Sequence, residues 1–177
     1  AGQFIDVVIT EVMANSLRSN EFSEAVGLQY LGEALGMDNA PPRVPSADAF
    51  VAAYTKRFNA APDGPGIPNS FDATMIGLLA YQAAGPDATG AEIAAAVSRV
   101  TDPAGTQVTA DAAGFAEAAK VLAAGGTVSY QGGTGAVTFD ANGDVSAPAV
   151  IWSFEEAGTK EERYLSLDEV NKIIAGN

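Results

Sequence analysis

The feature that most constrains the fold is a glycine-rich stretch near the carboxyl end of the chain, residues 128–152. Within it, an Asn142-Gly143 pair lies among runs of alternating apolar and β-branched residues. These runs are residues 128–130, 135–139 and 145–154. An Asn-Gly pair in such a setting is the strongest short-range signal for a β-hairpin, because both residues tolerate the positive φ of a type I′ turn. The sequence therefore predicts a hairpin that turns at Asn142-Gly143.

The beginning of the chain predicts a strand. Residues 4–10 form a short, nearly continuous run of apolar, strand-forming side chains, which is typical of an inner strand of a parallel sheet. Glu11 and Val12 follow the carboxyl end of this run, where ligands of open α/β sheets bind. A solvated loop carboxylate is the commoner role for such a residue, so the residues alone leave a loop role and a ligand role open for Glu11.

Helical signals fill most of the chain between this strand and the hairpin. Ser46 is a good N-cap, and Thr89 with Glu92 forms a capping box. The expected helices cover residues 19–26 and 47–58, a segment that ends at residue 84, a segment that ends near residue 100, and residues 111–124, closed by Gly125-Gly126. Residues 28–38 are ambiguous. Because one strand cannot cover so many amphipathic helices, its partner strands are expected to be missing from this chain or supplied by another one.

The helix that ends at residue 84 offers a second candidate site at its beginning, where Asn69 or Ser70 is the predicted N-cap. The first backbone N–H groups of a helix have no partner within it and can receive a carboxylate ligand. A capping side chain is their commoner partner, so this helix start is a candidate and no more.

The chain after the hairpin is charged. Residues 155–163 are expected to be mobile, and Ser166 with Glu169 forms a second capping box for a helix that reaches Ile174. The Glu155-Glu156 and Glu161-Glu162 pairs could pass for an acid–base pair. Such runs are usually a solvated face of the protein.

The composition excludes most enzyme mechanisms. The chain has no cysteine and no histidine, which rules out thiol nucleophiles, thiolate metal sites, histidine general bases and Ser-His-Asp triads. Its formal net charge is -13, so nucleic acid and anionic membrane surfaces are poor partners. We find no catalytic constellation, and the sequence predicts a protein that is not an enzyme and needs no cofactor.

Two motifs that suggest a bound metal or nucleotide fail on closer inspection. Asp140, Asn142 and Asp144 carry oxygens at alternate positions, like the start of an EF-hand calcium loop. That loop needs Gly at its sixth position and Glu at its twelfth, where this chain has Val145 and Ile151. A hairpin turn is the better interpretation. The glycines near residue 133 do not form GxGxxG at the start of a helix, so dinucleotide binding is not expected either.

The chain also has no sign of membrane insertion or of a leader. No apolar run approaches the roughly 18 residues that a spanning helix needs. The first residues lack a basic segment followed by an apolar one. Because the chain runs almost at once into a buried-strand pattern, we expect it to be a mature fragment of a longer protein.

Six segments in series resemble one family. They are residues 9–11, residues 17–22 leading to Gly27, residues 50–58, 70–73 and 93–97, and the pattern YxGxxGxVxFDxxGD at residues 130–144. In this order they are similar to the second half of the type I periplasmic binding proteins that serve branched-chain amino acid (Leu/Ile/Val-type) ABC transporters. The resemblance covers about residues 4–152.

The resemblance implies an α/β fold with two Rossmann-like lobes joined by hinge crossovers, of which this chain is the C-terminal half. Residues 1–26 would end the second lobe, and residues 27–127 would return into the first lobe. Residues 128–177 would form the closing hairpin, the crossover to the second lobe and the C-terminal helix. The missing N-terminal half would then hold the absent sheet partners.

The function implied by the resemblance is that of a periplasmic solute-binding component of an ABC importer. Such a protein binds an amino acid, branched-chain or otherwise aliphatic, in the cleft between its lobes and delivers it to the membrane permease. A ligand-sensing domain of the same fold in a receptor or regulator is the alternative.

The resemblance also assigns candidate ligand residues. Glu11 matches the acidic residue that receives the α-ammonium group of the amino acid, with Val12 beside it. Ile67, Asn69 and Ser70 match a region that touches the ligand from the first lobe. The chain departs from the family pattern at Phe71, where many relatives have Tyr, and in residues 156–163.

Overall fold

The computed structural model describes residues 8–9, 20–63, 66–156 and 158–176. These residues belong to two compact units. Unit 1 consists of Ala1–Pro41 and Ala147–Asn177, and unit 2 consists of Pro42–Ser146. The chain therefore leaves unit 1, forms unit 2 and returns. The lobes predicted for residues 1–26, 27–127 and 128–177 stay a prediction, since the two units are defined by contacts within this chain alone.

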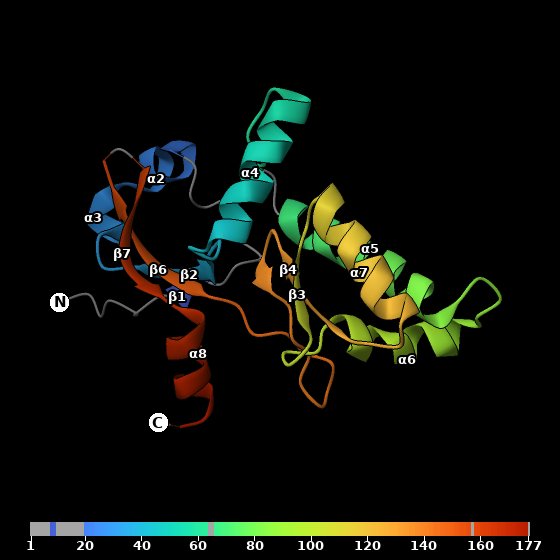
Figure 1. Ribbon diagram of the computed structural model, residues 1–177. Helices are drawn as coiled ribbons and strands as arrows, with labels where there is room; N and C mark the ends of the chain where they lie inside the picture. The colour runs from blue at the N-terminus through green and yellow to red at the C-terminus, as the bar shows by residue number, and fades with distance from the viewer. Residues whose placement is uncertain (1–7, 10–19, 64–65, 157, 177) are drawn as a thin grey trace. The chain divides into compact units, whose positions relative to one another are not determined.

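Unit 1 is built on a sheet with the strand order β1-β2-β6-β7. Its strands are β1 (Val8–Ile9), β2 (Leu35–Asn39), β6 (Ala149–Glu155) and β7 (Gly158–Leu165). β1 is parallel to β2, and the other neighbours are antiparallel. Helices α2 (Asn20–Val26) and α3 (Leu28–Leu31) lie against one face of this sheet, and α8 (Leu167–Ile174) follows β7 (Figure 1). The first strand thus has a partner within the chain, contrary to our expectation.

The core of unit 1 is centred on Trp152. Every second residue of β6 is buried, namely Val150, Trp152 and Phe154, as expected for a strand with one face on a core. The fully buried Trp152 ring lies against the backbone of Gly36 in β2, and an added Cβ at Gly36 would collide with it. Gly36 is therefore required by the close approach of this ring.

Unit 2 contains a sheet with the strand order β3-β4-β5. Its strands are β3 (Thr106–Thr109), β4 (Val128–Gly132) and β5 (Gly135–Ala136). The parallel strands β3 and β4 are connected by α7 (Ala112–Ala123), as parallel pairs require a crossover, and β5 turns back antiparallel to β4.

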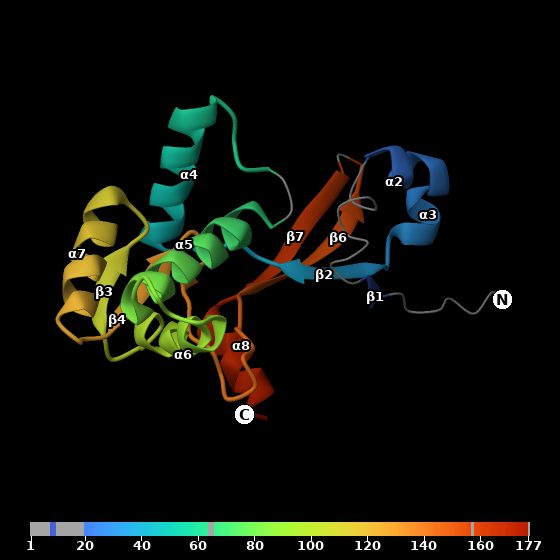
Figure 2. The same cartoon turned by 90° about the vertical axis from the view of Figure 1, so that its right-hand side faces the viewer.

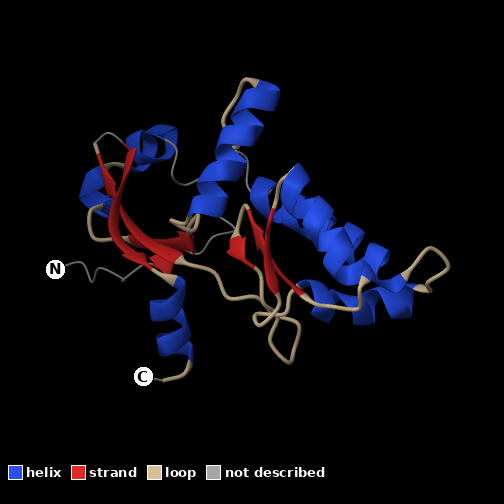
Figure 3. Ribbon diagram, in the orientation of Figure 1, coloured by secondary structure: helices blue, strands red, loops and turns tan. Residues whose placement is uncertain are grey.

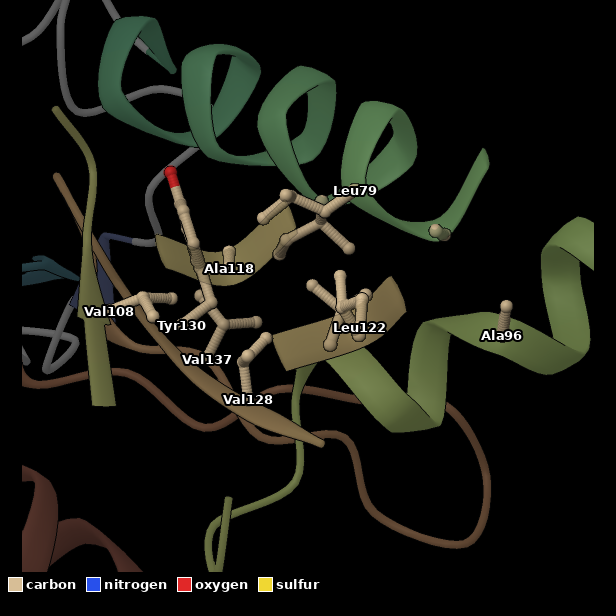
Figure 4. Packing of buried hydrophobic residues seen from close by; sticks show 11 residues of the cluster. Leu79, Ala96, Val108, Ala118, Leu122, Val128, Tyr130 and Val137 are labelled. Atoms are coloured by element: carbon tan, nitrogen blue, oxygen red, sulfur yellow. The ribbon is translucent and has the colours of Figure 1, made fainter. Parts of the chain in front are cut away.

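Three further helices complete unit 2. They are α4 (Pro45–Phe58), α5 (Ile67–Ala84) and α6 (Gly90–Val100). α5 and α6 lie side by side (Figure 1 and Figure 2). Leu79 of α5 and Leu122 of α7 meet Val128 and Tyr130 of β4 in a buried apolar core (Figure 4). No helix in the described residues is both long enough and apolar enough to cross a membrane.

Most of the predicted helices are confirmed, and two of them begin earlier than predicted. Capping boxes open α6 at Thr89 and α8 at Ser166, as predicted. α4 begins at Pro45 with Val44 as its N-cap, two residues before the predicted start, because proline is well tolerated in the first turn. α5 begins at Ile67 with Gly66 as its N-cap, so the prediction of Asn69 or Ser70 as the cap is wrong.

The predicted hairpin turn at Asn142-Gly143 is also wrong. Residues 137–148 form a loop between β5 and β6 (Figure 3). Gly143 has a positive φ of 87°, but among the described residues Asn59 is the only non-glycine residue with a positive φ, so a type I′ turn is absent. The Asp140 carboxylate instead accepts the backbone N–H groups of Asn142 and Asp144, at 2.8 and 2.9 Å.

Three strands were missed because their partners are distant in sequence or their residues are polar. β2 lies in the stretch that was ambiguous, and β3 lies in a stretch for which no element was predicted. Residues 155–163 were predicted to be mobile, yet most of them belong to β7, which pairs with β6. β7 has a charged middle that stays exposed, so it lacks the apolar alternation by which strands are recognised.

Candidate functional site

The predicted ligand residues fall into two groups. Glu11 and Val12 lie outside the described residues. Ile67, Asn69 and Ser70 lie together in the first turn of α5, where Ile67 is half-buried and the other two are exposed. The structure thus brings three of the five predicted residues onto one helix start in unit 2.

The start of α5 is not closed by a side chain. Gly66 adopts a left-handed conformation, with φ 71° and ψ 8°, and no side chain forms a capping hydrogen bond there. The Ser70 N–H donates to the Gly66 carbonyl at 2.8 Å, and Pro68 has no N–H. By helix geometry, the N–H groups of Ile67 and Asn69 have no acceptor within the helix.

This arrangement suits a small polar ligand with negative charge. The N-terminus of a helix carries a partial positive charge, and its unpaired N–H groups are good donors to a carboxylate. The exposed Asn69 amide and Ser70 hydroxyl add donors and acceptors on the same turn. The helix start can therefore bind and orient such a ligand, but it has no group that would carry out a reaction.

A buried carboxylate, which sequence analysis did not single out as a site residue, lies one turn into α5. Asp72 is only 2% exposed, and its side chain faces the turn between β4 and β5. Its Oδ1 accepts the Tyr130 hydroxyl and the Gly133 N–H, both at 2.9 Å. Its Oδ2 accepts the Thr134 N–H at 2.7 Å and the Thr134 hydroxyl at 2.6 Å. We call Asp72, Tyr130, Gly133 and Thr134 the Asp72 cluster.

The Asp72 cluster leaves no space for larger residues. A Cβ at Gly132 would collide with the Asp72 carboxylate, and a Cβ at Gly133 would approach the Phe50 ring to 2.8 Å. Burial and the neighbouring Asp72 charge raise the pKa of Tyr130 above its usual value, so this phenol stays protonated and remains a donor. In Figure 4 the Tyr130 ring rises from β4 with its hydroxyl oxygen directed towards α5.

A row of aromatic rings extends from the start of α5 along α4. Phe71 lies next to Phe50 with a centroid distance of 5.1 Å, and Phe50, Tyr54 and Phe58 follow one another at 5.9 and 4.6 Å. Such distances are typical of stabilising aromatic pairs. The row anchors the first turn of α5 against α4.

Unit 2 also has an open groove of about 540 Å³ elsewhere, between α6 and the loop at residues 138–143. None of the predicted ligand residues lines it. Asp102 and Asp140 at this groove have lowered pKa values. The causes are hydrogen bonds from Thr127 and the Ala104 N–H to Asp102, and from the Asp144 and Asn142 N–H groups to Asp140. These carboxylates are engaged in hydrogen bonds within unit 2, and the described residues hold no group of side chains that could bind a metal ion.

The glutamates of the β6–β7 hairpin are exposed and do not form a catalytic pair. Glu162 accepts hydrogen bonds from Ser153 at 2.7 Å and Lys160 at 3.0 Å, which lower its pKa. A general acid would need a raised pKa in a shielded site. This region is therefore a solvated face, as the sequence indicated.

The fold is of mixed α/β structure, with two units that the chain enters in turn. A family described as "Receptor family ligand binding region" matches residues 5–156, and the chain belongs to this family. The type I periplasmic-binding fold predicted from the sequence is thereby confirmed.

Individual proteins are less similar to the chain than the family model is. None of the curated proteins matches the chain. The crystal structure of the leucine-binding protein LivK from Thermotoga maritima is similar, with 19% sequence identity and a TM-score of 0.48. The match covers 93% of this chain and 45% of LivK, so the chain spans less than half the length of that protein.

Proposed function

We propose that this chain is part of an extracytoplasmic solute-binding protein that captures an amino acid and delivers it to the membrane permease of an ABC importer. The family match supports ligand binding as the activity. The observation that carries the proposal within the chain is the open start of α5, where N–H groups without an acceptor in the helix lie together with two exposed polar side chains. The protein performs no chemistry on its ligand.

In this proposal the ligand lies between two lobes. Glu11 and Val12 contact it from the second lobe, and Ile67, Asn69 and Ser70 contact it from the first. Glu11 receives the α-ammonium group, because a desolvated ammonium needs a carboxylate partner. The rest of the first lobe is supplied by an N-terminal half that precedes this sequence in the complete protein.

The energies are consistent with an aliphatic amino acid. Burying the four carbons of a leucine side chain contributes on the order of 3 kcal/mol. Polar contacts would supply the rest of a micromolar affinity, which corresponds to about -8 kcal/mol. Removing one partner of a buried ion pair costs about 3 to 5 kcal/mol. Loss of the Glu11 charge should therefore weaken binding by at least a hundredfold.

Calorimetry on the complete two-lobed protein tests the proposal with a panel of common amino acids, L-leucine first. We expect micromolar binding of an aliphatic member and its loss in Glu11→Gln. Glu21→Gln, which removes an exposed carboxylate on α2, is the matched control and should bind as the unaltered protein does. Absence of binding by every amino acid, or unchanged binding in Glu11→Gln, would defeat the proposal.

A ligand-sensing domain of the same fold is the second candidate, favoured by the description of the family as a receptor family. Binding alone does not separate the two functions. The complete gene does so more simply: a transmembrane or DNA-binding segment next to this region favours a sensor. A permease gene alongside, together with amino acid uptake that stops when this gene is deleted, favours the importer.

A further inference from the structure

We infer that Asp72 is a positioning residue for ligand binding. Its hydrogen bonds to the β4–β5 turn fix the open start of α5 in place. The inference rests on the proposed function, because it assigns a role to a residue behind the proposed ligand contacts. It is carried by a buried carboxylate that has four hydrogen-bond donors and that no proposed ligand contact uses.

The geometry explains why an open helix start needs such support. The first turn of α5 has no side-chain cap, and its N-cap is a glycine. Helix ends without caps fray, and a frayed turn would not hold Asn69 and Ser70 in one place. Asp72 follows directly on this turn and joins it to the β4–β5 turn through both of its oxygens.

The donor set makes the carboxylate difficult to replace. Two of the four donors, Gly133 and Thr134, are backbone N–H groups that cannot rotate away. Each oxygen of Asp72 accepts one of them. An asparagine has one carbonyl oxygen, so in either orientation of its amide an NH₂ group would face a backbone N–H. Asp72→Asn therefore keeps the shape of the side chain and removes half of the attachment.

The first experiment measures L-leucine binding to the complete protein by calorimetry, at a temperature where each variant is folded. We expect the dissociation constant to rise by roughly tenfold or more in Asp72→Asn, since a backbone N–H that faces an NH₂ group in place of an oxygen no longer fixes the first turn of α5. Val100→Ala is the stability control, because it removes apolar volume from the core of unit 2 on α6, a helix that contributes no residue to the Asp72 cluster. Its affinity should stay unchanged.

A double-mutant cycle separates positioning from a general loss of stability. If Asp72 acts through the first turn of α5, then Asp72→Asn should weaken binding much less in a protein that already carries Asn69→Ala. Additive effects of the two substitutions, or equal losses in Asp72→Asn and Val100→Ala, would overturn the inference. Should Asp72→Asn fail to fold, Thr134→Val removes one hydrogen bond of the cluster and should weaken binding about two- to fivefold.

Amide hydrogen exchange gives a reading that needs no ligand. The Ser70 N–H bonds to Gly66 at the start of α5, and the Phe115 N–H bonds to Asp111 at the start of α7. We expect Asp72→Asn to speed exchange at Ser70 by roughly tenfold more than at Phe115. If no amino acid binds but Ser70 exchanges faster, the proposed function fails and the positioning role stands. Equal changes at both amides overturn the positioning role itself.

Discussion

The two helices that lie side by side in unit 2, α5 and α6, begin in opposite ways. At the start of α6, the Thr89 N–H donates to the Glu92 carboxylate at 2.8 Å, and the Glu92 N–H donates to the Thr89 hydroxyl at 3.4 Å. At the start of α5, Gly66 supplies no side chain and no capping hydrogen bond is present. α6 is closed by its own residues, whereas the first turn of α5 keeps its donors available.

A helix start can thus lack a side-chain cap and still be fixed in place by tertiary hydrogen bonds. The capping box satisfies α6 locally, through residues three positions apart. α5 is held by Asp72, whose partner Gly133 is 61 residues away in sequence. The capping box closes the start of α6 with a side chain, whereas the start of α5 is left without a side-chain cap.

The largest effect is expected from Asp72→Ala, which removes all four hydrogen bonds of the Asp72 cluster. The buried Gly133 N–H and Tyr130 hydroxyl and the partly buried Thr134 N–H lose their acceptor. We expect a loss of about 4 kcal/mol in the free energy of unfolding, since each unsatisfied group costs about 1 to 3 kcal/mol. Urea denaturation measures it, with Asp87→Ala in the loop before α6 as the control. If both variants lost a similar amount of unfolding free energy, Asp72 would have no special role in fixing α5.

Gly66→Ala tests whether the open start of α5 requires glycine. A Cβ there meets no neighbouring atom, so any cost comes from the left-handed conformation, with φ of 71°. That cost is about 1.5 kcal/mol for a residue with a side chain. Gly77→Ala, inside the same helix with equal space around it, should be neutral or stabilising. Thermal unfolding of both variants decides the point, and an equal response would show that Gly66 has no conformational role.

Thr89→Ala tests the closed start. It removes the hydroxyl that caps α6, and we expect a loss of about 1 kcal/mol in the free energy of unfolding. The proposed ligand contacts on α5 should be unaffected, so L-leucine affinity should not change. Ser98→Ala, on the exposed face of α6, controls for loss of a hydroxyl alone. A drop in affinity with Thr89→Ala would mean that the two helix starts are coupled.

The smallest effect concerns pH. Hydrogen bonds from the Thr89 N–H and hydroxyl hold the pKa of Glu92 below its usual value of 4.5. A carboxyl whose pKa is lowered on folding stabilises the protein above its unfolded pKa, and this contribution is lost as the pH falls through the folded pKa. Glu92→Gln should therefore flatten the decline in stability below pH 4.5, as followed by denaturation at a series of pH values. An unchanged pH profile would argue against the charged capping box.

The sequence predicted those parts of the structure that depend on neighbours along the chain. The capping boxes at Thr89 and Ser166, and the glycine after α7, Gly125, with φ of 82°, follow from residues within one turn of each helix. Such signals act through local hydrogen bonds and backbone conformation, so they can be predicted from the sequence pattern alone.

Features that depend on distant partners were not predicted. The Asn142-Gly143 pair has the composition of a hairpin turn, but Asp140 binds the backbone N–H groups of its own loop and the strands pair elsewhere. The Asp72 cluster was also missed, since its partners in the β4–β5 turn lie about 60 residues away in sequence. Two features of the sequence could have revealed the cluster. One is an acidic residue on the apolar face of a helix, and the other is the Gly132-Gly133 pair, which lets a carboxylate approach.

The most direct test of the account is an NMR titration of the complete protein with L-leucine, followed at the backbone amides of the two helix starts. We expect large shifts for Ile67 and Asn69 at the open start of α5 and little change for Gly90 and Ala91 at the capped start of α6. Saturating L-leucine binding that leaves the Ile67 and Asn69 amides unmoved would contradict it.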